Sequence, residues 1–296
     1  MRIVATMLIL CATAIAQAQT PAPKPTLADV LKASQPSDWR PLDPARTLYL
    51  DLPAGRVVIE LHPKIAPNHV ANILSLAKEG WFDGTAVIRS HDNYVAQWGD
   101  PTEKKAVKTA KRKLEGEFTT PVGKDFAFDK LPDADGYAPE VGFSSSFPVG
   151  RDAKAGTAWL AHCYGAVGVG RGNETNSGDG TSLYAVTGHA PRHLDRNITV
   201  VGRVVQGMPL LSSLPRGTGN LGFYEKPEQQ VPIKSVRIAA DVPAAERISL
   251  EVLRTDTATF TKAVEALRNR GGDWFKVPAG YIELCNVQVP VRVVAK

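Results

Sequence analysis

The sequence predicts a mainly β fold, and three observations support that prediction. Residues 47–52 and 56–61 alternate as short strands on either side of Pro53-Ala54-Gly55, which is a hairpin signal. Further strand patterns then recur over residues 85–90, 94–98, 158–162, 166–169, 182–187, 199–205 and 233–239. Turn-forming residues separate these patterns, and long helical patterns are scarce among them. Many short strands joined by turns are typical of an antiparallel β domain.

One clear helix follows the first hairpin. Pro67 suits the first turn of a helix that runs to residue 78, and Gly80 lies just past its end. Four residues at helical spacing form an apolar face: Val70, Ile73, Leu74 and Ala77. A second, short helix is predicted over residues 209–214.

Residues 101–155 differ from their surroundings, being polar and rich in Lys, Pro, Gly and Asp. This segment is expected to be a long ordered insertion between strands, with a helix around residues 104–114. Six of the ten residues from 104 to 113 are basic, which is the usual composition of a solvated surface. A second irregular stretch, the Gly- and Asn-rich residues 170–181, is expected to be a loop.

The last 53 residues, 244–296, form a strand–helix–strand extension. Residues 247–253 alternate as a strand, residues 257–268 have helical spacing, and residues 281–294 are again strand-like. A piece of this size lies at the lower limit of independent folding, so it is expected to dock on the main body, residues 39–243.

The first 18 residues predict a secretory signal peptide. Arg2 precedes an apolar run over residues 3–15, and Ala16-Gln17-Ala18 provides the small residues of a cleavage site. The run is short for a membrane span, which needs roughly 20 residues. Lipidation at Cys11 is the alternative, but Leu10 stands where a small residue is expected. We therefore expect an exported, periplasmic protein.

Residues 19–38, rich in Pro, Ala and Lys, would follow the cleavage site as a flexible tether, with Thr26 as the N-cap of a short helix. Loss of Arg2 with the signal would lower the formal net charge from +5 to +4. Because the chain is expected to be exported and its basic residues are dispersed outside residues 104–113, we expect no nucleic-acid partner. No second stretch of the sequence is long and apolar enough to cross a membrane, so we expect no membrane association after cleavage. We also expect a monomer.

Two cysteines, Cys163 and Cys285, remain after removal of the signal. An even count in an oxidising compartment is compatible with one disulfide. Two separate buried thiols are the alternative, and spacing along the chain does not decide between them.

The segment from Val87 to Asp100 contains an unusual arginine. Arg89 stands among apolar residues of a strand, where an unpaired arginine is rare. Strand alternation would place Val87 and Arg89 on the same face. Taken alone, this pattern also fits an arginine at the rim of the domain that pairs with a carboxylate.

Four blocks of sequence, in order, resemble the cyclophilins, a family of peptidyl-prolyl cis-trans isomerases. They are RVVIELHPKIAP at residues 56–67 with HVAN at 69–72, GWFDGT at 80–85, residues 87–100 with the ending QWGDP at 97–101, and residues 180–187 with Leu194-Asp195 and VGRV at 201–204. Together they span roughly residues 47–240. The resemblance implies an eight-stranded antiparallel barrel capped by two helices, no cofactor, and proline-containing polypeptides as clients.

The resemblance also implies roles for individual residues. Arg89 matches the catalytic arginine, and Gln97 matches the glutamine that orients it. The remaining positions match residues that bind substrate: Tyr94, Val95, Arg171, Ser182, Tyr184, His193 and Leu194. No nucleophile is required, because the rotation barrier of roughly 18–20 kcal/mol arises from amide resonance.

Several positions depart from the family pattern at the edge of the pocket. Ser182 replaces a glutamine, Leu183 an aromatic residue, and Val169-Gly170 a Met-Ala pair; His193 replaces a tryptophan and Ile198 a histidine. These substitutions support an alternative hypothesis, a proline-binding chaperone or scaffold of the same fold with weak or no isomerase activity.

Other possible sites are less well supported. Ser90-His91-Asp92 contains the residue types of a catalytic triad, but neighbouring residues point in different directions and a working triad joins distant positions. The glycines around Arg171 are not followed by the helix that a dinucleotide site needs. The six histidines show no ligand spacing, so no metal site is predicted.

Overall fold

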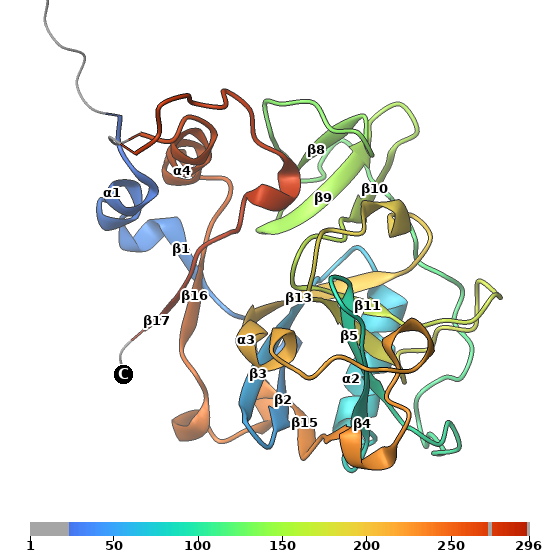
Figure 1. Ribbon diagram of the computed structural model, residues 1–296. Helices are drawn as coiled ribbons and strands as arrows, with labels where there is room; N and C mark the ends of the chain where they lie inside the picture. Colours follow the sequence, from blue (N-terminus) through green and yellow to red (C-terminus); the bar gives the residue numbers. More distant parts are fainter. Residues whose placement is uncertain (1–23, 272–273, 295–296) are drawn as a thin grey trace, which may run out of the picture.

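Nine strands pair in one antiparallel sheet in the computed structural model, which describes residues 24–271 and 274–294 (Figure 1). The predicted signal peptide lies outside the described residues. The order of the strands in the sheet is β14-β4-β5-β12-β11-β13-β3-β2-β15. Their bounds are β2 Thr47–Leu52, β3 Gly55–Leu61, β4 Ala86–Ser90, β5 Val95–Gly99, β11 Ala166–Val169, β12 Leu183–Val186, β13 Val200–Gln206, β14 Val231–Pro232 and β15 Ser235–Ile238.

The two edges of this sheet meet. The edge strands β14 and β15 are separated by only two residues, Ile233 and Lys234. The amide of Ile233 donates to the Thr85 carbonyl beside β4 (2.8 Å), and the amide of Lys234 donates to the Asp51 carbonyl of β2 (2.9 Å). One segment therefore bonds to both edges, so β14 and β15 act as a single eighth strand. The predicted eight-stranded antiparallel barrel is confirmed.

Helices α2 (Pro67–Lys78) and α3 (Met208–Ser212) place their apolar residues in the core of the barrel. Val70, Ile73 and Ala77 of the predicted face of α2 are buried, and Leu76 is more deeply buried than Leu74. From α3, Leu211 is fully buried in the same core. Burial of this continuous apolar surface is the main contribution to the stability of the barrel.

The predicted insertion forms a second, five-stranded sheet of order β6-β10-β9-β8-β7. The bounds of its strands are β6 Thr120–Pro121, β7 Asp129–Lys130, β8 Glu140–Ser144, β9 Phe147–Asp152 and β10 Thr157–Leu160. The strand expected over residues 158–162 thus belongs to this sheet and not to the barrel.

The helix predicted around residues 104–114 is wrong, because the chain there has no regular secondary structure. Carboxylates from outside the segment accept its backbone amides: Asp100 accepts from Lys104 (2.8 Å) and Lys105 (2.7 Å), and Glu79 from Thr109 (2.9 Å). Amides engaged in this way are not available for helical hydrogen bonds.

The two ends of the described chain lie together on one side of the barrel (Figure 1). Strand β1 (Trp39–Pro41) pairs with β16 (Leu250–Leu253), which pairs with β17 (Val291–Val293). Helix α1 (Leu27–Lys32), capped by Thr26 as predicted, packs Val30 against α4 (Ala258–Arg268). Of the strand-like residues 281–294, only β17 forms a strand.

A second hydrophobic core joins these ends to the sheet of the insertion. It contains Trp39 near the N-terminal end, Phe143 and Trp159 of the insertion sheet, and Phe260 and Leu284 of the tail. The tail therefore packs mainly against the insertion sheet. Within the described residues, no helix is long and apolar enough to cross a membrane.

Candidate active site

A β-bulge in β4 turns Arg89 out of the barrel. The pairing of β4 with β5 shifts register between Val87 and Arg89, so that Arg89 lies opposite Gln97. An extra residue in one strand reverses the alternation of faces. Val87 is consequently fully buried in the barrel core, whereas Arg89 is half-buried on the outer face. The expectation that these two residues share a face was wrong.

Three neutral acceptors hold the guanidinium of Arg89. Its Nη1 donates to Gln97 Oε1 (3.0 Å), its Nε donates to the Leu221 carbonyl (2.6 Å), and its Nη2 lies 3.1 Å from His91 Nδ1. In the described part of the chain no carboxylate forms an ion pair with it. Burial lowers the pKa of Arg89, and the nearby Tyr94 hydroxyl opposes this only partly.

Gln97 connects Arg89 to the next strand. Its Nε2 donates to Ser182 Oγ (2.9 Å), so the amide is fixed at both ends. A side chain at position 170 would collide with this link, because a Cβ on Gly170 would lie 2.8 Å from Ser182 Oγ and 3.1 Å from Gln97 Nε2. Ser182 thus acts on Gln97, and the role of Gly170 was not foreseen from the sequence.

Aromatic rings surround Arg89. The guanidinium carbon lies 5.5 Å from the centre of the Tyr94 ring and 5.2 Å from that of Phe223. On the other side of Tyr94, the exposed His193 ring is stacked nearly parallel at 6.5 Å. Burial raises the pKa of Tyr94. The structure therefore brings Arg89, Gln97, Tyr94 and His193 together, with Leu194 adjacent in sequence and partly buried.

The side chains of Val95 and Tyr184 are more deeply buried than is expected for residues that line an open pocket. They are only 2% and 5% exposed, and both belong to a hydrophobic cluster that includes Phe147 and Leu160 of the insertion. Tyr184 lies opposite Gln97 in the pairing of β12 with β5, so it is on the outer face. Burial raises the pKa of its hydroxyl strongly.

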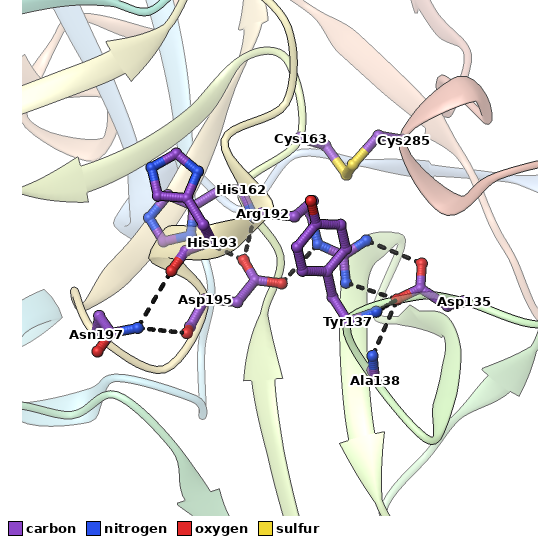
Figure 2. A network of polar contacts seen from close by, with 10 residues as sticks. All are labelled: Asp135, Tyr137, Ala138, His162, Cys163, Arg192, His193, Asp195, Asn197 and Cys285. Carbon is purple, nitrogen blue, oxygen red and sulfur yellow. Dashed lines mark hydrogen bonds and ion pairs between the residues drawn. A yellow bond between two sulfur atoms is a disulfide. The ribbon is translucent and has the colours of Figure 1, made fainter.

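A buried polar network continues from Tyr184 to the insertion, and Figure 2 shows its part from His162 to Asp135. The Tyr184 hydroxyl lies 2.9 Å from His162 Nε2, and His162 Nδ1 lies 2.9 Å from Asp195 Oδ1. The other carboxylate oxygen of Asp195 accepts from Arg192 Nε (2.5 Å), and Arg192 also donates twice to Asp135 (3.1 Å each). Burial opposes ionisation of Asp195, but the hydrogen bond from His162 and the charge of Arg192 lower its pKa overall.

This network holds the turn that carries two predicted site residues. Arg192–Leu194 forms a 3₁₀ turn, which includes His193 and Leu194. Asn197 Nδ2 donates to the carbonyls of His193 (3.2 Å) and Asp195 (3.1 Å), as Figure 2 shows. The wall of the site is therefore anchored to Asp135 of the insertion.

Arg171 is not part of the group around Arg89. Its Nε donates to the Asn197 carbonyl (2.9 Å) and its Nη1 to the Gly172 carbonyl (2.7 Å). Its guanidinium carbon lies 5.4 Å from the centre of the Phe118 ring. These contacts stabilise the loop that follows β11.

Cys163 and Cys285 form a disulfide, with their Cα atoms 4.9 Å apart across 122 residues of sequence. The sequence left open one disulfide or two separate buried thiols, and the structure contains the disulfide. Cys163 directly follows His162, so the bond ties the tail to the end of the buried network (Figure 2).

Three residues near Arg89 were not predicted as site residues: His91, Leu221 and Phe223. The sequence pattern offered His91 a role only within the Ser90-His91-Asp92 triplet. Its ring instead contacts Arg89, whereas Ser90 (3.4 Å) and Asp92 (3.0 Å) both accept from Arg216. Leu221 and Phe223 are more than 120 residues away from Arg89, and no local pattern marks them. Among the described residues, no cluster of three potential metal ligands is present.

Comparison with known proteins agrees with this geometry. Residues 47–238 match the family model "Cyclophilin type peptidyl-prolyl cis-trans isomerase/CLD". A probable peptidyl-prolyl cis-trans isomerase of Brucella suis is 31% identical over 177 residues, which are 60% of this chain and 74% of that protein. The human peptidyl-prolyl cis-trans isomerase-like 1 is 26% identical over 72% of this chain and 99% of its own length.

Similarity to a solved structure extends beyond the barrel. The crystal structure of cyclophilin AquaCyp293 from Hirschia baltica has a TM-score of 0.69 at 26% identity, covering 90% of this chain and 96% of that one. Coverage of this extent exceeds the barrel alone. The chain belongs to the cyclophilin-type peptidyl-prolyl cis-trans isomerase family.

Proposed function

We propose that Arg89 is the catalytic group of this prolyl isomerase, that Gln97 orients it, and that the enzyme acts on exported polypeptides. Tyr94, Val95, Tyr184 and Leu194 form the wall against which the proline ring binds. His193 lies at the edge of the site beside Tyr94. Ser182 holds the amide nitrogen of Gln97. Arg171 supports the neighbouring loop.

The position of Arg89 carries this proposal. A guanidinium has five N–H bonds, and three of them engage Gln97, Leu221 and His91. Two therefore remain for a substrate. Because all three partners are neutral, the positive charge is fixed in position without being neutralised.

Such a group can lower the barrier to prolyl rotation without covalent chemistry. As the amide twists, conjugation is lost and the imide nitrogen gains a lone pair that can accept a hydrogen bond. A fixed cationic donor stabilises this twisted state more than the planar one, which is differential binding of the transition state. Arginine suits the role because it stays charged and presents its donors in a rigid fork.

The test is the rate of cis-to-trans isomerisation of a proline-containing peptide. Arg89→Ala is expected to lower kcat/KM about 10²-fold or more, as does loss of a transition-state donor elsewhere. Arg89→Lys retains the charge but loses the fork, so it should recover only part of the rate. Arg237→Ala, on β15 and paired with Asp83, is the matched control and should retain activity.

The same experiment separates the enzyme from a proline-binding chaperone. The near-complete burial of Val95 and Tyr184 leaves little of their apolar surface for a proline ring and favours slow turnover. Equal rates at background for wild type and Arg89→Ala, with peptide binding retained, would identify a binding protein.

Export to the periplasm is supported by the predicted signal peptide and by the Cys163–Cys285 disulfide, since such bonds persist in oxidising compartments. Mass spectrometry of the protein from a periplasmic extract should show cleavage after Ala18 and a mass 2 Da below that of the reduced form. Light scattering should give the mass of a monomer. Recovery only from the cytoplasm with both thiols free would contradict this proposal.

A further inference from the structure

His91 occupies a position in which it can control Arg89. It follows β4 in the turn before β5, and its backbone amide donates to the Val95 carbonyl (2.9 Å), which fixes the turn. Its ring meets the Tyr94 ring edge-on at 5.2 Å. The backbone of Gly222 packs against it so closely that a Cβ there would lie 2.5 Å from the His91 Cα. The imidazole is therefore confined beside Arg89.

The contact between the two side chains requires a neutral histidine. Every polar hydrogen of a guanidinium is a donor, and the group has no acceptor. His91 Nδ1, 3.1 Å from Arg89 Nη2, must therefore provide a lone pair, with the proton on Nε2. Protonation of the ring would replace this hydrogen bond by two facing N–H groups and two like charges.

We infer that His91 is a positioning residue for Arg89 and that its protonation lowers isomerase activity. This rests on the proposed catalytic role of Arg89. Histidine is the side chain that changes charge between about pH 5 and pH 8. Acidification across this range removes one of the three anchors of Arg89, so the guanidinium samples orientations that do not serve catalysis.

Within residues 24–271 and 274–294, no carboxylate pairs with His91 to compensate its positive charge. The Asp92 carboxylate pairs with Arg216 (3.0 Å). The other ionisable groups facing the ring are Arg89 and Tyr94, and beyond Tyr94 lies His193. From the opposing segment, Leu221, Gly222 and Phe223 contribute no ionisable side chain. The cation formed at low pH would thus face another cation.

The deciding measurement is the pH dependence of kcat/KM in an assay without a coupling protease. For the wild type, kcat/KM should fall roughly three- to tenfold from pH 8 to pH 5, in line with the net contribution of one intramolecular hydrogen bond. His91→Asn places an amide oxygen near the Nδ1 position and does not titrate. Whatever its rate at pH 8, its kcat/KM should stay the same from pH 8 to pH 5.

Two further variants complete the test. His91→Phe removes the acceptor and should be slow at every pH. His189 is an exposed histidine whose backbone amide donates to Asn93 Oδ1 (2.8 Å), so His189→Asn should retain the wild-type acidic decline. A decline in His91→Asn equal to that of the wild type, or no decline in the wild type, would overturn the inference.

A spectroscopic readout separates this inference from the proposed function. The Arg89 Nε–H resonance should shift with the same midpoint as the imidazole of His91, and the shift should vanish in His91→Asn. An unaffected rate in Arg89→Ala would refute the catalytic role of Arg89. A pH-independent Arg89 resonance would refute the contact with His91, whatever the result for Arg89→Ala.

Discussion

Two arginines of this protein, Arg89 and Arg192, each lie against an aromatic ring but have opposite electrostatic surroundings. An aromatic ring lies within 5.2 Å of each guanidinium carbon, Phe223 for Arg89 and Tyr137 for Arg192. Arg89 is bonded to neutral acceptors, and burial lowers its pKa. Burial also disfavours the charge of Arg192, but Asp195 and Asp135 outweigh this and raise its pKa.

The difference shows how one residue type serves two purposes. Carboxylates neutralise Arg192 and fix it, which makes the network a structural support for the wall of the site. Neutral acceptors also hold Arg89 in place but do not neutralise its charge. Position and neutralisation are thus separate properties, and the combination found at Arg89 is the one that its proposed catalytic role requires.

The largest expected effect is on the structural side of this comparison. Arg192→Met would leave Asp135 and Asp195 buried without a cation, which typically costs about 3–5 kcal/mol of unfolding free energy. Urea unfolding measures this directly. The control is Arg237→Met, whose partly exposed pair with Asp83 should cost at most about 1 kcal/mol. Equal losses in the two variants would mean that the network adds no support.

A second prediction tests whether burial disfavours the charged form of another basic side chain, His62, as it does that of Arg89. Burial lowers the pKa of His62 from 6.5 to about 3. Between these values the unfolded chain binds a proton that the folded protein does not, so stability is present above pH 6.5 and is lost as the pH falls. The expected loss between pH 7 and pH 5 is on the order of 2 kcal/mol.

The same urea experiment on His62→Gln should show a flatter dependence of unfolding free energy on pH over that interval. An unchanged slope would assign the loss of stability in acid to other groups.

Gln97→Glu would give Arg89 a carboxylate partner, as Arg192 has. A carboxylate at this position would accept from Arg89 Nη1, now about 3.0 Å from the amide oxygen, and neutralise the guanidinium. We expect kcat/KM to fall about tenfold, equivalent to about 1.4 kcal/mol, with unchanged urea unfolding. Ser182→Ala, which removes only the far anchor of Gln97, should have a smaller effect. Wild-type activity in Gln97→Glu would show that neutralisation is unimportant.

The smallest effect is expected where the two regions meet. Tyr184→Phe removes the hydroxyl that contacts His162 and leaves the ring in the wall of the site. Loss of one buried hydrogen bond should lower the unfolding free energy by about 1 kcal/mol. The rate of peptide isomerisation should change less than about twofold, because the apolar surface is retained. A larger loss of activity than of stability would assign the hydroxyl a direct role in turnover.

Much of the barrel was predictable because its signals are local. The hairpin around Pro53-Ala54-Gly55, the face of α2 and the cap at Thr26 follow from periodicity and capping within a few residues. The helix predicted around residues 104–114 failed for the opposite reason, since side chains on other elements accept its amides. In the sheet of the insertion, β6 and β7 are two residues long and carry no periodic signal. The longer strands β8 and β9 were missed because the composition of residues 101–155 was interpreted as an irregular insertion.

Some residues of the candidate site were likewise predictable from local sequence, and others were not. Arg89, Gln97 and Tyr94 were identified because they lie within nine residues in a recognisable block. No sequence pattern indicates the bulge that turns Arg89 outward, so strand alternation predicted the wrong face for Arg89. Leu221 and Phe223 reach Arg89 from a distant segment, and Tyr184 was expected to face an open pocket without its contact to His162.

The sequence by itself determined the family, the positions of most barrel strands along the chain and the residues of the central block, because these depend on neighbouring residues and on recognisable motifs. Only the tertiary structure decided what surrounds the two arginines. Whether a guanidinium meets a carboxylate or a carbonyl depends on side chains that folding brings together from different segments. That choice separates Arg89, which retains its charge for substrate, from Arg192, which is neutralised within the fold.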